Sequence, residues 1–377
     1  MDFSLTREQE MLRDMVREFT QRELAPRALA LDEKGEFIHD IIKKTAELGL
    51  VGIITSKEYG GTGVGHLARM IMIEEFSRVY ASLGFFFQTG QIGMYILENF
   101  GTPEMKKKYL PALCRADLII ATALTESGGG SDPGAIQTTA ELKGDEYIIN
   151  GRKVMISEAP VCDLAIIVAK TGDKFSAFLV EKGMPGFTTS GKENYVGLRS
   201  LPVGDLVFTN CKVPKANLIG QEGRGLAVAI GGISAIGRTG VAAVGLGTAE
   251  GCYDAAVKYA KERKLFGKPI TELPAIQYLL VDSNVEIECA RWLCYKAATL
   301  LDQGKSPRDA GDDITRCKLY TCNIASQIAL RAIQIMGGYG TIPQYEVVRR
   351  LNDSIELFTA AGTQEVMKNT LARSIIA

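Results

Sequence analysis

Histidine and tryptophan are scarce in this sequence, which has two histidines, one tryptophan and eight cysteines among 377 residues. The histidines, His39 and His66, are far apart in sequence, and no two cysteines form a Cys-x-x-Cys pair. Protein metal centres usually draw on His or Cys ligands at short spacings, and the sequence has no such pattern. We therefore expect no metal site, and we expect the cysteines to be reduced and mostly buried.

An excess of one charge and a long apolar run are also absent. The 43 basic and 44 acidic residues are interspersed and give a net charge of -1, so there is no basic footprint for nucleic acid. No uninterrupted run of about 20 apolar residues occurs, and we expect no membrane span. The first residues have neither the basic-then-apolar order of a signal peptide nor the Arg/Ser bias of a transit peptide. We expect a cytoplasmic protein, or a mitochondrial-matrix protein if the sequence is a processed form.

The first part of the chain has helical patterns. Thr6 and Gln9 form a capping-box pattern before apolar residues at helical spacing. Similar patterns cover 37–48 and 67–80. We assign 1–118 to an N-terminal α-helical domain.

Short β-type runs follow, at 138–142, 146–149, 153–157, 164–169, 177–180 and 206–208. Asn150-Gly151, between the second and third runs, is a type I′ hairpin signal. These features predict a middle antiparallel β-domain over 119–224.

Long helical patterns return after residue 225 and break near 267–270, 304–307 and 337–340. They predict a C-terminal domain over 225–377 that is similar to a four-helix bundle. Gly245-Leu-Gly247 lies within a helical pattern and opens no βαβ unit, so it predicts close helix packing and no dinucleotide site. The fold class predicted for the whole chain is α+β, mainly α.

Several motifs occur in a fixed order. Residues 123–132 read Ala-Leu-Thr-Glu-Ser-Gly-Gly-Gly-Ser-Asp, and 262–268 read Glu-Arg-Lys-Leu-Phe-Gly-Lys. Farther on come Gln-Ile-Met-Gly-Gly-Tyr-Gly at 334–340, Arg-Leu-Asn-Asp at 350–353, and Ile-Glu-Leu-Phe-Thr-Ala-Ala-Gly-Thr at 355–363. In this order the motifs resemble those of the acyl-CoA dehydrogenase family. The resemblance implies that family's α, β, α architecture, an FAD cofactor and an acyl-CoA thioester substrate.

The resemblance places FAD between the β-domain and the C-terminal bundle. Thr125 matches a residue that hydrogen-bonds the flavin ring, Ser157 stands where a threonine usually contacts flavin N5, and Met155 replaces a tryptophan that packs on the ring. Two further residues match FAD-binding positions of the family. Ser131 lies in the loop of residues 123–132, and Thr363 closes the Gly-Thr pair that follows the position of the catalytic base. The residues that match contacts to the adenosine diphosphate part of FAD, across a subunit interface, are Arg263, Phe266, Gln334 and Gly338. A cofactor site shared between subunits implies an oligomer, and the family resemblance implies a homotetramer.

The usual catalytic base of the family is missing. In most members a glutamate precedes the Gly-Thr pair and removes the α-proton of the thioester, but here that position is Ala361. A minority carry the glutamate before the arginine of the first bundle helix, and here that position is Gly237. The backbone N–H of Ala361 is still available to polarise the thioester carbonyl. Ala360 replaces a common tyrosine, so the small residues favour a wide, branched or cyclic acyl group.

Other positions match the substrate side of the family's site. Ser131 and Arg238 stand where relatives contact the CoA chain, and Gly362 follows the missing base. The far end of the acyl pocket is matched by Gln88, Gln91 and Tyr95. Two glutamines are unusual in a pocket for a long alkyl chain, because an unpaired buried amide costs about 1–3 kcal/mol. We expect them to hydrogen-bond a polar substituent of the substrate or one another, and Gln91 is a candidate catalytic residue of the pocket. Glu158 is expected on the outer side of the flavin site.

Three interpretations remain open. The first is an FAD-dependent acyl-CoA oxidoreductase that acts, with a non-standard base, on a cyclic or bulky thioester of the cyclohexane- or cyclohexene-carboxyl-CoA type. The same class without the glutamate includes acyl-CoA desulfinases, which would need an arginine near the acyl end. The second is an ordinary α,β-acyl-CoA dehydrogenase whose glutamate at position 361 was replaced by engineering. The third is a non-catalytic acyl-CoA- or flavin-binding homologue. For a catalytic protein, the resemblance implies an electron-transfer flavoprotein or another electron acceptor as partner.

Overall fold

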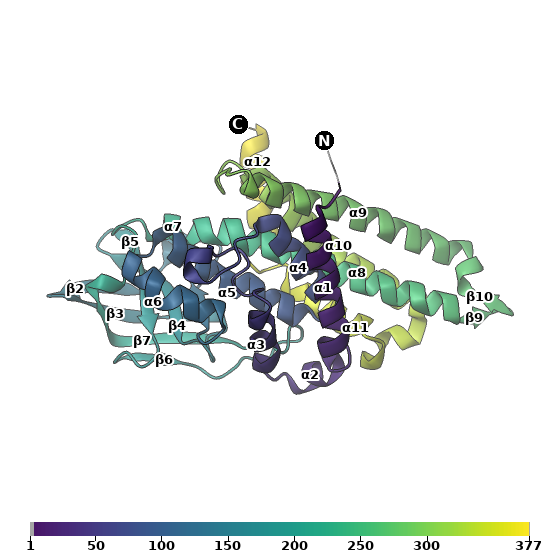
Figure 1. Ribbon diagram of the computed structural model, residues 1–377, viewed down its shortest axis with the longest axis horizontal. Coiled ribbons are helices and arrows are strands. Elements are labelled where there is room, and N and C mark those ends of the chain that lie inside the picture. The colour runs from purple at the N-terminus through teal and green to yellow at the C-terminus, as the bar shows by residue number, and fades with distance from the viewer. Residues whose placement is uncertain (1–3, 377) are drawn as a thin grey trace.

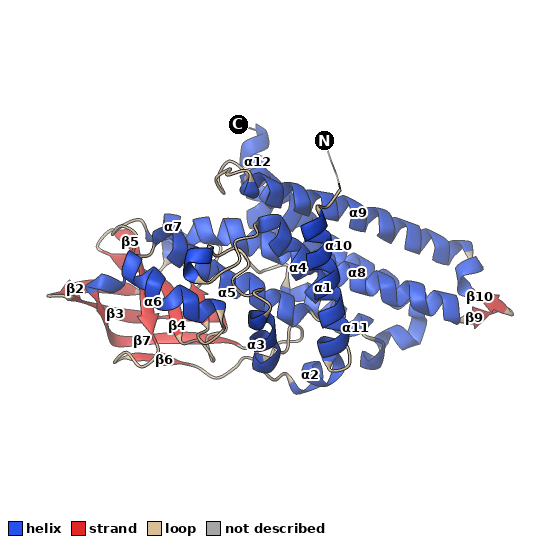
Figure 2. Ribbon diagram, in the orientation of Figure 1, coloured by secondary structure: helices blue, strands red, loops and turns tan. Residues whose placement is uncertain are grey.

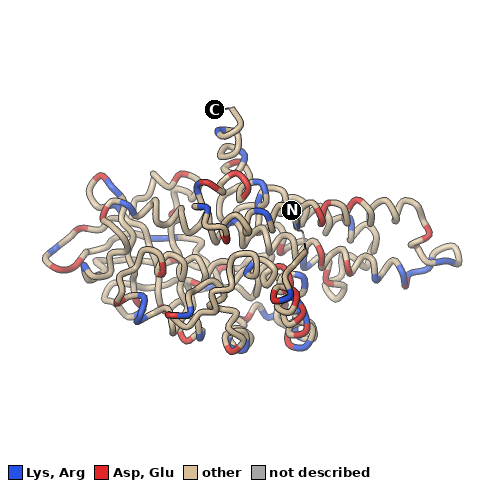
Figure 3. Tube along the Cα trace, turned by 45° about the horizontal axis from the view of Figure 1, so that its top comes forward, with Lys and Arg blue, Asp and Glu red and all other residues tan. Residues whose placement is uncertain are grey.

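The computed structural model describes residues 4–376, which form three parts. Helices form the N-terminal part, a β-sheet forms one end of the molecule, and long helices extend from beside the sheet to the opposite end (Figures 1 and 2). Basic and acidic residues are both scattered over the molecule (Figure 3). The order α, then β, then α is the one that the sequence patterns predict.

Six helices make up the N-terminal part. The predicted capping box at the start of α1 is confirmed: the Gln9 N–H donates to Thr6 Oγ1 (3.3 Å), and the Thr6 N–H donates to Gln9 Oε1 (2.9 Å). Most residues of α4 and α5 are buried, so these two helices form the centre of this part. The helices are α1 (Arg7–Phe19), α2 (Ala28–Lys34), α3 (His39–Glu47), α4 (His66–Val79), α5 (Ala81–Phe100) and α6 (Pro103–Cys114).

An eight-stranded sheet forms the middle part. Its strand order is β6-β7-β3-β2-β4-β5-β8, with β1 paired to β4. The prediction of a purely antiparallel sheet is wrong, because β1 and β2 both pair with β4 in parallel and reach it through long connections. The strands are β1 (Ile120–Ala123), β2 (Thr139–Lys143), β3 (Glu146–Ser157), β4 (Leu164–Thr171), β5 (Lys174–Glu181), β6 (Phe187–Thr189), β7 (Val203–Pro214) and β8 (Leu218–Ile219).

The hairpin predicted at Asn150-Gly151 is wrong, because β3 continues through both residues. The turn between β2 and β3 is instead Gly144-Asp145, since Lys143 pairs with Glu146. Gly151 has a φ of +150° and lies where the register between β3 and β7 shifts. Asn150 faces two residues of β7, Thr209 and Asn210, so the extra residue of this β-bulge is on β7, where Asn210 has a φ of +48°.

The C-terminal part is helical, and its breaks lie where the sequence predicted them. A continuous stretch joins α7 (Gly225–Gly232) to α8 (Thr239–Glu262) through a π-helical segment, η5 (Ile233–Arg238). A short hairpin, β9 (Lys264–Leu265) and β10 (Lys268–Pro269), follows α8. The remaining helices are α9 (Pro274–Asp302), α10 (Gly311–Met336), α11 (Val347–Glu356) and α12 (Gln364–Ile376).

The stretch Gly225–Glu262 is long and apolar enough to cross a membrane by length and composition, with a mean hydropathy of 1.5 in its most apolar window. However, 72% of that window is buried inside the protein. A Cβ on Gly247 would lie 2.1 Å from Glu74 O of α4, and one on Gly245 would lie 3.2 Å from Thr321 O of α10. The predicted close packing at these glycines is confirmed, and the stretch is a core helix.

One large hydrophobic cluster joins the N-terminal helices to the C-terminal ones, and a smaller one lies within the sheet. All eight cysteines are free, and Cys289 alone is exposed. The prediction of mostly buried thiols is confirmed, and their reduced state stays a prediction.

Gly151→Ala should lower the free energy of unfolding by roughly 1–3 kcal/mol, because alanine is strained at this φ. A Cβ at position 151 would also lie 2.7 Å from Thr138 Cα, and this contact adds to the strain. The measurement is equilibrium unfolding in urea. Gly191→Ala is the matched control, since a Cβ there meets no atom within 4 Å. Equal stabilities of the two variants would contradict the bulge assignment.

Candidate active site

The loop after β1 lies against the end of β3. The Val154 N–H donates to Thr125 O (3.0 Å), which brings Thr125 beside Met155. The Met155 side chain is 55% exposed, and its backbone, with a φ of +59°, is held by a hydrogen bond from its N–H to Asp205 Oδ1 (3.3 Å). Ser157 follows two residues later and is half-buried. An exposed thioether close to hydroxyl side chains fits an aromatic ring with polar edges, such as the flavin predicted here.

A buried ion pair, which the sequence analysis missed, holds this loop to the sheet. Lys153 Nζ lies 2.8 Å from Glu126 Oε1, and Glu126 also accepts hydrogen bonds from the Thr138 hydroxyl (2.6 Å) and two backbone N–H groups. Burial raises the pKa of Glu126, but these hydrogen bonds outweigh it and the pKa lies below its ordinary value. A sequence signal for the burial of Lys153 was available. The period of two along β3 puts Lys153 on the same face as Ile149, which is buried.

The loop before α12 forms a turn at the position of the missing base. Ala361 has a φ of +54°, which few residues other than glycine adopt, and Gly362 has a φ of +110°. Lys318 of α10, a fully buried residue that the sequence analysis also missed, donates to Gly362 O (2.7 Å) and Phe358 O (3.3 Å). Arg238 donates to Ala361 O (3.4 Å). Arg238 therefore supports this loop, and its contact with CoA stays a prediction.

The two family positions for the base lie together. A Cβ built on Gly237 would lie 3.5 Å from Ala361 Cβ, 3.2 Å from Ile92 Cδ1 and 3.5 Å from Gln88 Nε2. Gln88 Nε2 donates to Gly237 O (3.2 Å), while its buried Oε1 has no partner among residues 4–376. An unpaired buried amide oxygen is costly, so Gln88 offers an acceptor to a group that enters here. Ala360, next to Ala361, is half-buried.

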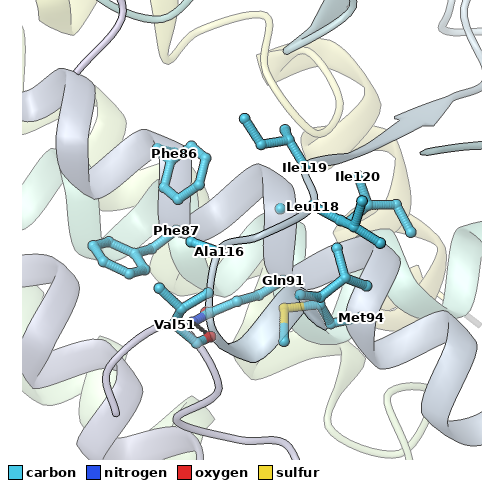
Figure 4. A pocket seen from close by; sticks show the side chains of 11 residues that line it. Val51, Phe86, Phe87, Gln91, Met94, Ala116, Leu118, Ile119 and Ile120 are labelled. Carbon is cyan, nitrogen blue, oxygen red and sulfur yellow. Dashed lines mark hydrogen bonds between the residues drawn. The ribbon is translucent and has the colours of Figure 1, made fainter. Parts of the chain in front are cut away.

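Gln91 belongs to a different place. Figure 4 shows it at a small apolar pocket together with Val51 and Met94. Gln91 Nε2 donates to Val51 O (3.1 Å), and its Oε1 accepts from Arg69 Nε (2.6 Å). Both ends of the amide are therefore occupied, and the structure does not bring Gln91 to the position of the missing base. Tyr95, one turn farther along α5, is half-buried.

The expectation that Glu158 lies on the outer side is wrong. Its exposed fraction is 0%, and a hydrogen bond joins its carboxyl group to the Thr89 hydroxyl of α5. Glu158 has a φ of +61° and lies two positions after buried Ile156, so the period of two along β3 already places its side chain on the buried face. Burial raises the pKa of Glu158 to about 8 against the opposing effect of the Thr89 hydrogen bond.

The residues predicted to contact the adenosine diphosphate part of FAD lie at the end of the bundle away from the sheet (Figure 1). Arg263 begins the β9–β10 hairpin, and the side chain of Phe266 is 87% exposed. The Tyr259 and Tyr339 ring centroids are 6.2 Å apart, which places the end of α8 beside the segment after α10. Two exposed residues of that region complete the set, Gln334 and Gly338. Thr125 instead lies beside Val154 of β3, in the sheet.

Two other predicted site residues are near the surface or have a structural role. Ser131 is exposed in the loop after β1. The Val366 N–H donates to Thr363 Oγ1 (3.3 Å), so Thr363 caps the start of α12. Their contacts with substrate or cofactor stay predictions.

Lys153→Met should lower the free energy of unfolding by about 3–5 kcal/mol, because Glu126 would remain buried without its cation. The loss is measured from urea unfolding curves. The double variant Lys153→Met/Glu126→Gln removes both charges and should recover part of the stability. A double variant no more stable than the single one would show that the ion pair is not the cause.

Family models match nearly the whole chain. The acyl-CoA dehydrogenase N-terminal domain matches residues 6–117, the middle domain matches 121–211, and the C-terminal domain matches 223–376.

Curated relatives align over nearly all of this chain. A short-chain specific acyl-CoA dehydrogenase of Clostridium acetobutylicum is 40% identical over 100% of both chains. A caffeyl-CoA reductase-Etf complex subunit of Acetobacterium woodii is 37% identical over 97% of both. The cyclohex-1-ene-1-carbonyl-CoA dehydrogenase of Syntrophus aciditrophicus is 36% identical over 99% of this chain and 91% of its own length.

Solved structures agree with these matches. Butyryl-CoA dehydrogenase from Megasphaera elsdenii is 32% identical with a TM-score of 0.96 over 100% of both chains. An FAD complex of PigA is 31% identical with a TM-score of 0.94 over 100% of this chain and 99% of that one. The chain belongs to the acyl-CoA dehydrogenase family of FAD-dependent oxidoreductases.

Proposed function

We propose that this protein is an FAD-dependent acyl-CoA oxidoreductase whose site takes a ring-bearing or similarly bulky acyl group. The observation that carries the proposal is the pairing of Gly237 with Ala361, which leaves two small residues where relatives of either type place a glutamate. Ala360, next to Ala361, is half-buried and adds a third small residue at this place. Two of the relatives act, by their names, on caffeyl-CoA and cyclohex-1-ene-1-carbonyl-CoA, both of which carry a six-membered ring.

The chain's own residues supply the polar framework of this site. The hydroxyl groups of Thr125 and Ser157 would hold the flavin, and Met155 would pack on it. FAD supplies the two-electron exchange with the acyl chain. The Ala361 N–H would polarise the thioester carbonyl, and Lys318 fixes the turn that presents it. An electron-transfer flavoprotein would exchange electrons with the flavin, as the name of the Acetobacterium relative suggests.

The FAD site is proposed to be completed by another copy of the chain in a homotetramer. Arg263 and Phe266 belong to the β9–β10 hairpin at the end of the bundle away from the sheet, whereas Thr125 bonds β3 of the sheet, and this separation supports a site that a second chain completes (Figure 1). Along α9, Tyr278, Val281 and Val285 are 67%, 59% and 55% exposed. Their spacing puts them on one helical face, and such an apolar face fits a subunit interface.

A desulfinase is the second candidate, because a buried arginine lies near Gln88. Arg69 is fully buried, and its guanidinium reaches only neutral oxygens, those of Gln91, Thr239 and Ile236, among residues 4–376. A Cβ on Gly240 would lie 2.6 Å from Arg69 Nη2 and 2.5 Å from Gln88 Cγ. Burial lowers the pKa of Arg69 to about 9, and an anionic acyl end group would stabilise its charge.

The substrate class is tested by anaerobic titration of the FAD-bound protein with butyryl-, cyclohexanecarboxyl-, cyclohexenecarboxyl- and sulfinate-bearing acyl-CoA. We expect bleaching of the flavin by a ring thioester and none by butyryl-CoA, because the usual base is missing. Sulfite release would support the desulfinase instead. Bleaching by butyryl-CoA in Ala361→Glu, with no thioester active on the unaltered protein, would show an ordinary dehydrogenase that has lost its base and would overturn the proposal.

The oligomer is tested with Val281→Glu, which puts a charge on the exposed face of α9. We expect smaller particles by light scattering and weaker retention of FAD, because the subunits that share the site would separate. Val64→Glu is the control, since Val64 is similarly exposed (56%) but lies in a loop away from this face. An unchanged mass for Val281→Glu would contradict the interface.

A further inference from the structure

Glu158 is a fully buried carboxyl group with no cation to pair with. No lysine, arginine or histidine among residues 4–376 forms an ion pair with it, and its Oε2 has no hydrogen-bond partner there. An ionised carboxylate in such a place is costly. The φ of +61° at Glu158 also costs free energy. These costs are typical of a side chain that has a role in a site.

The bonding of Thr89 is consistent with a protonated Glu158. The Thr89 hydroxyl lies 3.0 Å from Phe85 O and also contacts Glu158 Oε1. A hydroxyl has one proton, so it donates to one of these oxygens. If it donates to Phe85 O, the Glu158 carboxyl has to donate to Thr89, and this requires the carboxylic acid. The burial that raises the pKa of Glu158 to about 8 favours the same form.

Glu158 is connected to the position of the missing base through α5. Thr89, its partner, is the neighbour of Gln88, whose side chain bonds Gly237 O. Gly237 in turn faces Ala361. On the other side, Glu158 directly follows Ser157, which is predicted to contact the flavin. The Glu158 carboxyl group therefore bonds the helix that carries Gln88, and it follows the predicted flavin contact Ser157 by one residue.

We infer that Glu158 is the proton-transfer group of this site and replaces the glutamate missing at 361 and 237. This inference rests on the proposed function. In the oxidation direction, a C–H bond of the acyl chain breaks, its proton forms an O–H bond with the Glu158 carboxylate, and its electron pair stays on the acyl group as enolate charge. A hydride lost from a second carbon to FAD would complete the two-electron oxidation. In reduction, the protonated carboxyl returns the proton to carbon.

Few titratable groups face Glu158 from the elements packed against it. From its own loop the Cys162 thiol interacts electrostatically with Glu158, and it is itself buried with a pKa raised to about 12. On the opposite side, α5 has no Asp, Glu, Lys or Arg from Ala81 to Leu97. The segment before β7 contributes Pro202 O, which accepts from the Glu158 N–H (2.7 Å). A titration near neutral pH that disappears in a Glu158 variant is therefore assigned to this group.

The protonation state is tested without substrate, by infrared difference spectra of FAD-bound Glu158→Gln and unaltered protein over pH. We expect a carboxylic acid C=O band that is lost near pH 8 and is missing from the variant. The folded-state pKa is raised, so the stability that the acid form contributes is fully present below the ordinary pKa of 4.5 and is lost as the pH rises through about 8. Glu158→Gln should therefore gain urea resistance relative to the unaltered protein over this range. Spectra that show an ionised Glu158 carboxylate at every pH in this range would overturn the inference.

Proton transfer is tested by deuterium exchange from D2O into cyclohexanecarboxyl-CoA, measured by mass spectrometry. Glu158→Gln should slow the exchange by about 10²–10⁴-fold, as expected for a positioned acid–base group. Glu98→Gln is the control, because this carboxyl is also on α5 but bonds the Ser56 N–H outside the site. An unchanged rate and pH profile in Glu158→Gln, with flavin bleaching intact, would overturn the inference alone. No bleaching and no exchange by the unaltered protein with any thioester would overturn the proposed function and the inference with it.

Discussion

The site depends on how buried ionisable groups are accommodated, because a charge inside a protein must be paired, hydrogen-bonded or given up. Lys153 is paired with Glu126, and this pair holds the loop that carries Thr125. Lys318 is bonded to two carbonyl oxygens, and these bonds hold the turn at Ala361. Glu158 has no cation, so it keeps its proton to a higher pH. Lys153 and Lys318 hold two loops of the site, and Glu158 is the proposed proton-transfer group.

The proposed role of Glu158 explains how the site can work without a glutamate at positions 361 and 237. Removing a carboxylate from both family positions leaves room for a bulky acyl group but also leaves the site without an acid or base there. Glu158 directly follows β3, whereas Ala361 lies in the loop before α12. A proton-transfer group in that place would act on a different carbon, or a different face, of the acyl chain. Because its pKa is near neutrality, it would serve oxidation and reduction alike.

Much of the fold could be predicted from local patterns. The capping box at Thr6 and the packing glycines in α8 follow from local rules. The hairpin at Asn150-Gly151 could not be predicted correctly, because a bulge and a turn need the same backbone freedom and tertiary pairing decides between them. The bond of Glu158 to Thr89 of α5 depends on tertiary packing across 69 residues, which a sequence does not show. The bonds of Lys318 join α10 to a loop 40 and 44 residues away, and no spacing rule links them.

The most direct test of the central claim is a crystal structure of the FAD-bound protein with cyclohexanecarboxyl-CoA, prepared without oxygen. The account predicts that Glu158 Oε2 lies about 3–3.5 Å from a carbon of the acyl group that bears hydrogen, the separation needed for reaction. It also predicts that the ring occupies the space beside Gly237 and Ala361. A Glu158 carboxyl group separated from the acyl chain by another side chain would contradict the account.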